Sequence, residues 1–270
     1  PKLGVRSKGS RGRVRKKNGM KADGFQGVLC FALIVSYIFS RAAFAQDLSL
    51  VEQKVHKLSN TVWWVEPVPG YGGNIAVSAG EDGILMVDDQ LMPLTDAIKE
   101  AVAGIQEGKI DFLINSHYHY DHTGQAADFS GATLLVDRAD WDVINKREDL
   151  SANFGPWIGG NGSVQTLTYD HDVFGDGSVI MLKAPGHTPG HRSLLVRLKD
   201  RGPILLSGDA VHFRENWSRK GVPSFNTSRA ESLASMDRLR DVADQLGAAL
   251  VIQHEPTDIT KLALFPEAAH

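Results

Sequence analysis

Residues 115–124 read Asn-Ser-His-Tyr-His-Tyr-Asp-His-Thr-Gly, directly after the apolar, strand-like run 112–115. Four side chains able to bind a metal fall within six residues of this stretch: His117, His119, Asp121 and His122. Neutral imidazole suits Zn²⁺, and a carboxylate adds a hard oxygen ligand. On an extended chain His117 and His119 point to the same side, whereas the following loop brings in Asp121 and His122 from another angle. The stretch therefore predicts a metal site with room for two neighbouring ions.

Three later apolar runs also end in a histidine or an aspartate. Residues 184–191 read Ala-Pro-Gly-His-Thr-Pro-Gly-His, and their glycines and prolines predict a tight turn with His187 at its tip. Asp209 follows the run 204–206, and His254 follows the run 250–253. Ligand sites gather at strand ends in layered α/β proteins, so we expect these side chains to meet at one edge.

Strand-like and helix-like patterns alternate along the whole chain, which predicts an α/β class with helices covering sheets. Apolar residues with helical spacing occupy 94–105, 138–146 and 230–246. Ser228 is expected to cap the last helix, with Glu231 completing a capping box. Short apolar runs typical of strands occupy 61–65, 74–78, 84–87, 112–115, 133–136, 179–183, 193–198, 204–206 and 250–253.

The first 45 residues differ in composition from the rest and predict a secretory signal peptide. A basic region precedes an apolar run of about a dozen residues (28–39), which is short for a membrane span. Ala43-Phe44-Ala45 offers a cleavage site, so we expect a catalytic domain over 46–270 in the periplasm or outside the cell. The single cysteine, Cys30, lies in the signal, so the mature chain offers no thiolate to a metal.

The charge balance limits the partners. Residues 1–45 carry ten Lys or Arg and one acid, so residues 46–270 hold 19 basic and 31 acidic residues and a formal charge of −12. A domain this acidic repels phosphate backbones, and we expect no nucleic-acid partner and no membrane association after cleavage. Trp63-Trp64 places one large aromatic side chain on each face of a strand, which leaves a homodimer open.

Taken together, these motifs resemble the metallo-β-lactamase-fold hydrolase superfamily, whose signature is His-x-His-x-Asp-His followed by a later His, Asp and His. The likeness runs from about Thr61 to His254 and implies an αββα sandwich with the metal site at one edge of the sheets. It also implies two zinc ions per chain. By the resemblance His117, His119 and His187 hold one ion, Asp121, His122 and His254 hold the other, and Asp209 bridges them. His191 is then expected to support the site rather than bind metal.

Within the superfamily the chain is most similar to the N-acyl homoserine lactone hydrolases. The resemblance rests on residues 185–196, 202–210 and 213–217. A mature chain without cysteine excludes the β-lactamases that use a cysteine ligand, and Asp209 is typical of the lactonase, glyoxalase and esterase-like branches. The chain departs from well-known lactonases at one place: His212 stands where they have a Tyr three residues after the bridging Asp.

The resemblance implies that a hydroxide shared by two zinc ions opens a lactone ring. Asp121 is expected to hold the nucleophile and pass its proton to the leaving oxygen, and His212 to orient the carbonyl group. Four aromatic residues near the motifs could line an acyl pocket or belong to the core: Phe154, Trp157, Trp217 and Phe225.

Other activities of the same fold stay open from the sequence. A β-lactamase acting on lactam antibiotics is favoured by export but disfavoured by Asp209. A thioesterase, another esterase or an organophosphate hydrolase would use the same ligands. Redox-active diiron proteins of this fold often carry an acid at the position of His119 and an added flavin domain, and neither feature is seen in this sequence.

Overall fold

The computed structural model describes residues 50–70, 73–198 and 202–259. The chain divides into two compact units, Pro1–Asp47 and Leu48–His270, and every described residue belongs to the second. The predicted signal peptide, residues 1–45, lies outside the described residues. In the part of the chain that is described, no helix is both long enough and apolar enough to cross a bilayer.

The first half of the described chain forms a seven-stranded sheet in the order β1-β2-β3-β4-β5-β6-β7. Its strands β1 to β4 pair antiparallel, and β4 to β7 pair parallel. The bounds are β1 (Glu52–Lys57), β2 (Val62–Val68), β3 (Ile75–Gly80), β4 (Gly83–Val87), β5 (Phe112–Ile114), β6 (Thr133–Asp137) and β7 (Val164–Leu167). The parallel strands β5 and β6 are buried almost throughout, as expected for strands covered on both faces.

The second half forms a five-stranded sheet in the order β12-β11-β10-β9-β8. The pairs are antiparallel except for β11 with β12, which run parallel. The bounds are β8 (His171–Asp172), β9 (Val179–Lys183), β10 (Arg192–Leu198), β11 (Gly202–Leu206) and β12 (Ala249–Val251). An apolar layer that includes Leu85, Ile114, Met181 and Leu194 packs the two sheets face to face.

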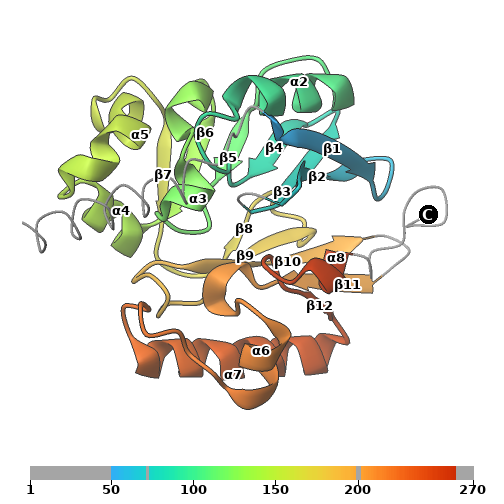
Figure 1. Cartoon of the computed structure of the whole chain (residues 1–270), viewed down its shortest axis with the longest axis vertical. Helices are drawn as coiled ribbons and strands as arrows, with labels where there is room; N and C mark the ends of the chain where they lie inside the picture. The colour runs from blue at the N-terminus through green and yellow to red at the C-terminus, as the bar shows by residue number, and fades with distance from the viewer. Residues whose placement is uncertain (1–49, 71–72, 199–201, 260–270) are drawn as a thin grey trace, which may run out of the picture. The chain divides into compact units, whose positions relative to one another are not determined.

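Helices cover the outer face of each sheet, which makes four layers (Figure 1). On the first sheet lie α2 (Thr95–Ile105), α3 (Tyr120–Thr123), η2 (Ala126–Phe129), α4 (Arg138–Ile144) and α5 (Glu148–Ile158). On the second sheet lie α6 (Arg214–Arg219) and α7 (Arg229–Leu246), while η3 (Gly208–Ala210) and α8 (Pro256–Ile259) follow β11 and β12. The predicted αββα sandwich is confirmed.

The long helix α7 shows why the outer layer forms. Its apolar stripe, including Leu239 and Ala243, packs on Leu205 of the second sheet. Ser228 caps the helix as predicted, its side chain accepting from the N–H of Glu231 at 3.2 Å. The N–H of Ser228 itself donates to the carbonyl of Gly186 at 2.9 Å, so it ties the helix start to the His187 turn rather than to the Glu231 side chain.

Candidate metal centre

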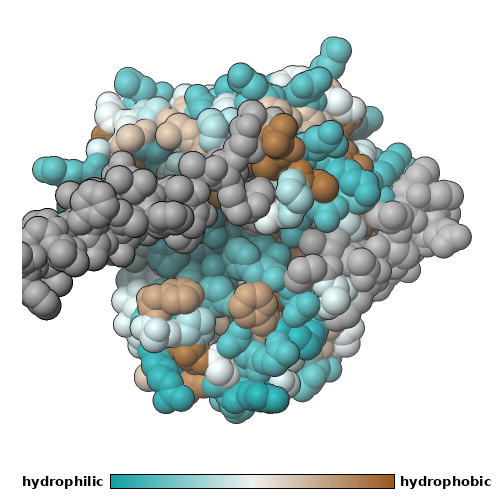
Figure 2. Space-filling model, viewed as in Figure 1, coloured by the Kyte–Doolittle hydropathy of each residue, from teal (hydrophilic) through white to brown (hydrophobic). Residues whose placement is uncertain are grey.

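All seven predicted ligands follow the carboxyl ends of strands β5, β9, β11 and β12. The structure brings them together in two groups whose possible ligand atoms lie within 4.8 Å of one another. The first group contains His117, His119 and His187, and the second contains Asp121, His122, Asp209 and His254. In the same view the molecular surface is hollowed between α3 and α6, and the hollow is hydrophilic (Figure 2).

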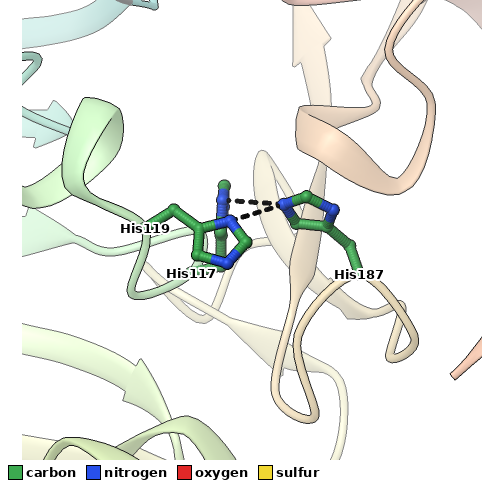
Figure 3. A group of neighbouring side chains, drawn as sticks. All are labelled: His117, His119 and His187. Carbon is green, nitrogen blue, oxygen red and sulfur yellow. Dashed lines mark hydrogen bonds between the residues drawn. The ribbon is translucent and has the colours of Figure 1, made fainter. Parts of the chain in front are cut away.

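In the first group three imidazoles point their ring nitrogens at one another (Figure 3). Nε2 of His187 lies 2.8 Å from Nδ1 of His119 and 3.1 Å from Nε2 of His117. Burial lowers the pKa of His117 well below its usual value and lowers that of His187 to about 4. Near pH 7 the rings are therefore neutral, and a cation between them would accept all three lone pairs.

In the second group the ring nitrogens of two histidines face carboxylate oxygens. Oδ1 of Asp209 lies 3.1 Å from Nε2 of His254 and 3.5 Å from Nε2 of His122. The latter nitrogen is also 3.5 Å from Oδ2 of Asp121. Within the described residues, Nε2 of His122 and Oδ1 of Asp209 are buried without a hydrogen-bond partner. Buried polar atoms are normally paired, so this pair of atoms fits a ligand that the protein chain does not supply.

The carboxylate of Asp209 faces both groups. Its Oδ1 faces the second group, whereas its Oδ2 lies 3.4 Å from Nε2 of His187 and 3.8 Å from Nε2 of His117. Burial alone would raise the pKa of Asp209, but the charge of His122 beside it holds this pKa well below its usual value. Asp209 is therefore an ionised carboxylate with one oxygen facing each group.

Asp88, at the end of β4, supports two of the histidines and was missed by the sequence analysis. Nδ1 of His122 donates to Oδ2 of Asp88 at 2.8 Å. The hydroxyl of Ser116 donates to the same oxygen at 2.7 Å and accepts from Nδ1 of His117 at 3.1 Å. These bonds place a proton on Nδ1 of each ring and point Nε2 of each ring towards the two groups. The available signal was a strand-end acid, as at Asp209.

Asn226 likewise orients the ring of His187, and the sequence analysis did not identify it. Its Oδ1 accepts from Nδ1 of His187 at 3.0 Å. The neighbouring Thr227 donates from both its backbone N–H and its hydroxyl to the carbonyl of His187. The segment before α7 therefore fixes both the ring and the backbone of this ligand. Nothing near Asn226 in the sequence marks it, because its partner lies 39 residues away.

His191 has both ring nitrogens occupied by the protein backbone. Nδ1 lies 3.2 Å from the carbonyl of Ala184, and Nε2 accepts from the N–H of Asp209 at 2.9 Å. The ring is fully buried, and it therefore positions Asp209 instead of facing the cluster. This arrangement agrees with the supporting role that the resemblance implied.

The turn that carries His187 depends on its glycines and on Asp140. Gly186 has φ +130°, and a Cβ there would lie 2.2 Å from the backbone nitrogen of Ser232. The buried carboxyl of Asp140 accepts from the Thr188 hydroxyl at 2.7 Å and from the Gly190 N–H at 2.6 Å. The turn is therefore held from α4 on one side and from α7 on the other.

Of the four candidate pocket aromatics, only Phe225 lies at the site. It is 65% exposed, and its ring meets those of His187 and His212 edge to face at 5.8 and 5.4 Å. Phe154 and Trp157, both on α5, are buried in the core, the second of the two roles that the sequence left open for them. Trp217 packs under the guanidinium of Arg240 at 4.2 Å.

Comparison with known proteins identifies the family. The model of the metallo-beta-lactamase superfamily matches residues 69–254. A curated relative, the N-acyl homoserine lactonase AttM of Azorhizobium caulinodans, is 33% identical over 169 residues, which cover 57% of this chain and 61% of the relative. The protein of the same name from Rhizobium johnstonii is 31% identical over 194 residues, covering 66% and 73%. The chain thus spans about three fifths to three quarters of these relatives.

Solved structures show the same architecture. A mutant of B. thuringiensis AiiA with N-decanoyl-L-homoserine bound at its active site superposes with a TM-score of 0.63 at 20% identity, over 80% of this chain and 98% of that one. The dizinc quorum-quenching lactonase AidC superposes with a TM-score of 0.59 at 15% identity, over 77% and 92%. At these identities the likeness establishes the fold. With the family match over more than half its length, the chain belongs to the metallo-β-lactamase superfamily.

Proposed function

We propose that this protein is a zinc-dependent hydrolase that opens the lactone ring of N-acyl homoserine lactones, and so removes such signals. The observation that carries the proposal is a complete pair of His/Asp groups sharing the carboxylate of Asp209. The curated relatives that the chain matches are named N-acyl homoserine lactonases, which supports this substrate class within the superfamily.

The two groups would each hold one zinc ion, with Asp209 between them. The donor set fits, since neutral imidazoles and carboxylates are ordinary zinc ligands and two buried ligand atoms are otherwise unpaired among the described residues. Zinc at these groups would polarise a carbonyl oxygen and make water acidic enough to act as a nucleophile near neutral pH.

Asp121 is the residue we propose for proton transfer. Its side chain is 39% exposed at the mouth of the second group, with Oδ2 3.5 Å from Nε2 of His122 and 3.8 Å from Nε2 of His254. Burial would raise the pKa of Asp121, but the charge of the adjacent His122 lowers it below its usual value, so Asp121 is ionised near neutral pH. The carboxylate can therefore accept a proton from the attacking water and return it to the ring oxygen.

In the overall reaction one bond forms and one bond breaks. The water oxygen bonds to the lactone carbonyl carbon, the bond from that carbon to the ring oxygen breaks, and the ring oxygen takes the proton. The product is an N-acyl homoserine with a free hydroxyl group and a carboxylic acid, and the acid ionises to a carboxylate by releasing the second proton of the water to solvent. The exposed ring of Phe225 offers an apolar contact beside the reacting groups. The orienting role predicted for His212 stays a prediction, and its Nε2 faces Asp209 at 3.3 Å.

We also propose that the domain acts after export, which rests on the predicted signal peptide with cleavage after Ala45. Expression of the full chain in a Gram-negative host, followed by fractionation and mass spectrometry, tests this directly. A mature protein beginning at Gln46 in the periplasm or medium is expected. A full-length protein retained in the cytoplasm would contradict the export proposal and leave the activity proposal intact.

The activity test uses purified, zinc-loaded protein and follows proton release at constant pH on N-hexanoyl homoserine lactone, with a β-lactam in parallel. We expect lactone opening that is lost in His117→Ala and in Asp209→Ala. His171→Ala is the matched control, because His171 lies on β8 and contacts Gln165 instead of the metal groups. Turnover of the β-lactam with an inert lactone would overturn the lactonase proposal and identify an antibiotic-hydrolysing enzyme.

A further inference from the structure

We propose that His212 is itself a metal ligand, on the ion that His187 and Oδ2 of Asp209 would hold. The inference rests on the proposed metal centre but not on the lactone substrate. It changes the expected role of position 212 from contact with the substrate to coordination of the metal.

The backbone holds His212 beside the cluster from both sides. The residue follows Asp209 by three positions, just after the short helix η3. Val211 before it is buried against Met236 and Ile252. Phe213 after it donates its N–H to Oδ1 of Asn216 at 3.0 Å, at the start of α6. The His212 side chain, only 12% exposed, is thereby directed inward.

The ring nitrogen of His212 lies on the first group's side of Asp209. Nε2 is 3.3 Å from Oδ2 of Asp209, the oxygen that is also 3.4 Å from Nε2 of His187. Ligand atoms of His187, Asp209 and His212 all lie within 4.8 Å of one another. Oδ1 of the same carboxylate faces the second group. A cation held by His187 and Asp209 Oδ2 would therefore have the imidazole of His212 beside it.

The protein does not hold the ring of His212 through its second nitrogen, Nδ1. Nδ1 is buried and has no hydrogen-bond partner among the described residues. In His191, by contrast, the Ala184 carbonyl and the Asp209 N–H occupy both nitrogens and turn the ring away from metal binding. Nε2 faces the carboxylate of Asp209 at 3.3 Å, and a cation bound at that carboxylate would take the lone pair of Nε2 in place of this contact.

The type of side chain matters at this position. Well-known lactonases, which the sequence resembles, carry a tyrosine there, and a neutral phenol is a hydrogen-bond donor and a poor zinc ligand. Imidazole is the commonest metal ligand among protein side chains. The ring of Phe225 contacts those of both His187 and His212 in edge-to-face geometry, so the two imidazoles share one neighbour. The replacement of tyrosine by histidine thus adds a donor to the metal.

A competing role for His212 is a simple hydrogen bond from Nε2–H to Asp209. The two roles differ in what a tyrosine would restore. A phenol at position 212 can donate to a carboxylate or to a substrate, but it does not replace an imidazole on zinc. The variant His212→Tyr therefore separates coordination from hydrogen bonding, and His212→Ala removes both.

The test measures metal affinity without any substrate. Zinc is titrated against a chromophoric chelator in the wild type, His212→Ala, His212→Tyr and the control His171→Ala, and cobalt(II) spectra are recorded for each. We expect both position-212 variants to bind one of the two ions at least tenfold more weakly and to change the cobalt spectrum. The His171→Ala protein should match the wild type. His212→Asn takes the place of the alanine variant if circular dichroism shows that the latter does not fold.

Wild-type affinity and an unchanged cobalt spectrum in both variants would overturn the inference. The same holds if His212→Tyr keeps the metal while only His212→Ala loses lactone turnover, since this is the pattern of a hydrogen-bond donor. A third outcome is that the position-212 variants lose metal affinity as expected while the wild-type protein does not open lactones. That result would contradict the proposed function and leave this inference standing.

Discussion

The carboxylate of Asp88 accepts a hydrogen bond from Nδ1 of His122 at 2.8 Å and, through the hydroxyl of Ser116, also orients His117. One acid from the end of β4 thus sets the tautomer of one histidine in each metal group. It is almost completely buried and adopts φ 59°, an unusual backbone conformation for a residue other than glycine. The metal groups are therefore coupled through a residue that touches neither ion site directly.

We expect Asp88→Ala to weaken zinc binding by about 10- to 100-fold, the usual effect of removing a carboxylate that orients a metal-binding histidine. Chelator competition measures the loss at each group. Asp82→Ala is the matched control, because Asp82 is an exposed acid on the turn before the same strand. Two zinc ions bound by the Asp88→Ala protein with wild-type affinity would show that the ring orientation does not depend on this carboxylate.

Asn226→Ala should weaken the first group in particular, because it removes the acceptor from Nδ1 of His187. We expect a loss of about tenfold in zinc affinity, with the second group little changed. The exposed Asn161 provides a control substitution of the same kind. Equal weakening of both groups would instead indicate that the segment before α7 has lost its fold.

Gly186→Ala should destabilise the domain by about 2 kcal/mol or more, since the added Cβ would meet backbone atoms of Ser232 and the residue would hold φ +130°. Thermal unfolding of the metal-free protein measures the effect. Gly131→Ala is the control, because a Cβ there would have no heavy atom within 4 Å. Similar melting temperatures for the two variants would contradict the close approach of the turn to α7.

Burial raises the pKa of Asp140 to about 7, although hydrogen bonds from Thr188 and Gly190 act in the opposite direction. The folded state therefore binds this proton more tightly than the unfolded chain, so the contribution of Asp140 to stability is lost as pH rises from about 4 to about 7. Asp140→Asn cannot ionise and should gain stability relative to the wild type between pH 5 and pH 8. Urea unfolding in the presence of a chelator, at both pH values, gives this difference. A constant difference between the two proteins would show that Asp140 is ionised throughout.

Two elements, β1 and α5, could not be predicted from local sequence. Strand β1 has an exposed or half-buried side chain at every position, so it lacks the apolar run of a buried strand. Helix α5 contains Pro156, which argues against a helix in any local pattern, yet its residues Phe154 and Trp157 are buried in the core. In both cases the neighbouring elements, rather than the segment itself, stabilise the structure.

The sequence by itself determined the class of fold, the strand ends and the seven candidate ligands. This was possible because apolar runs mark buried strands, and because His and Asp beyond them have few other uses at such density. Only the tertiary structure decided which residues support those ligands and which aromatic ring lies at the site. Asp88 meets His122 across 34 positions and Asn226 meets His187 across 39, and such contacts depend on how two sheets pack. Hydrophobic periodicity shows on which face of an element a residue lies, whereas the packing of the elements determines which residue it contacts.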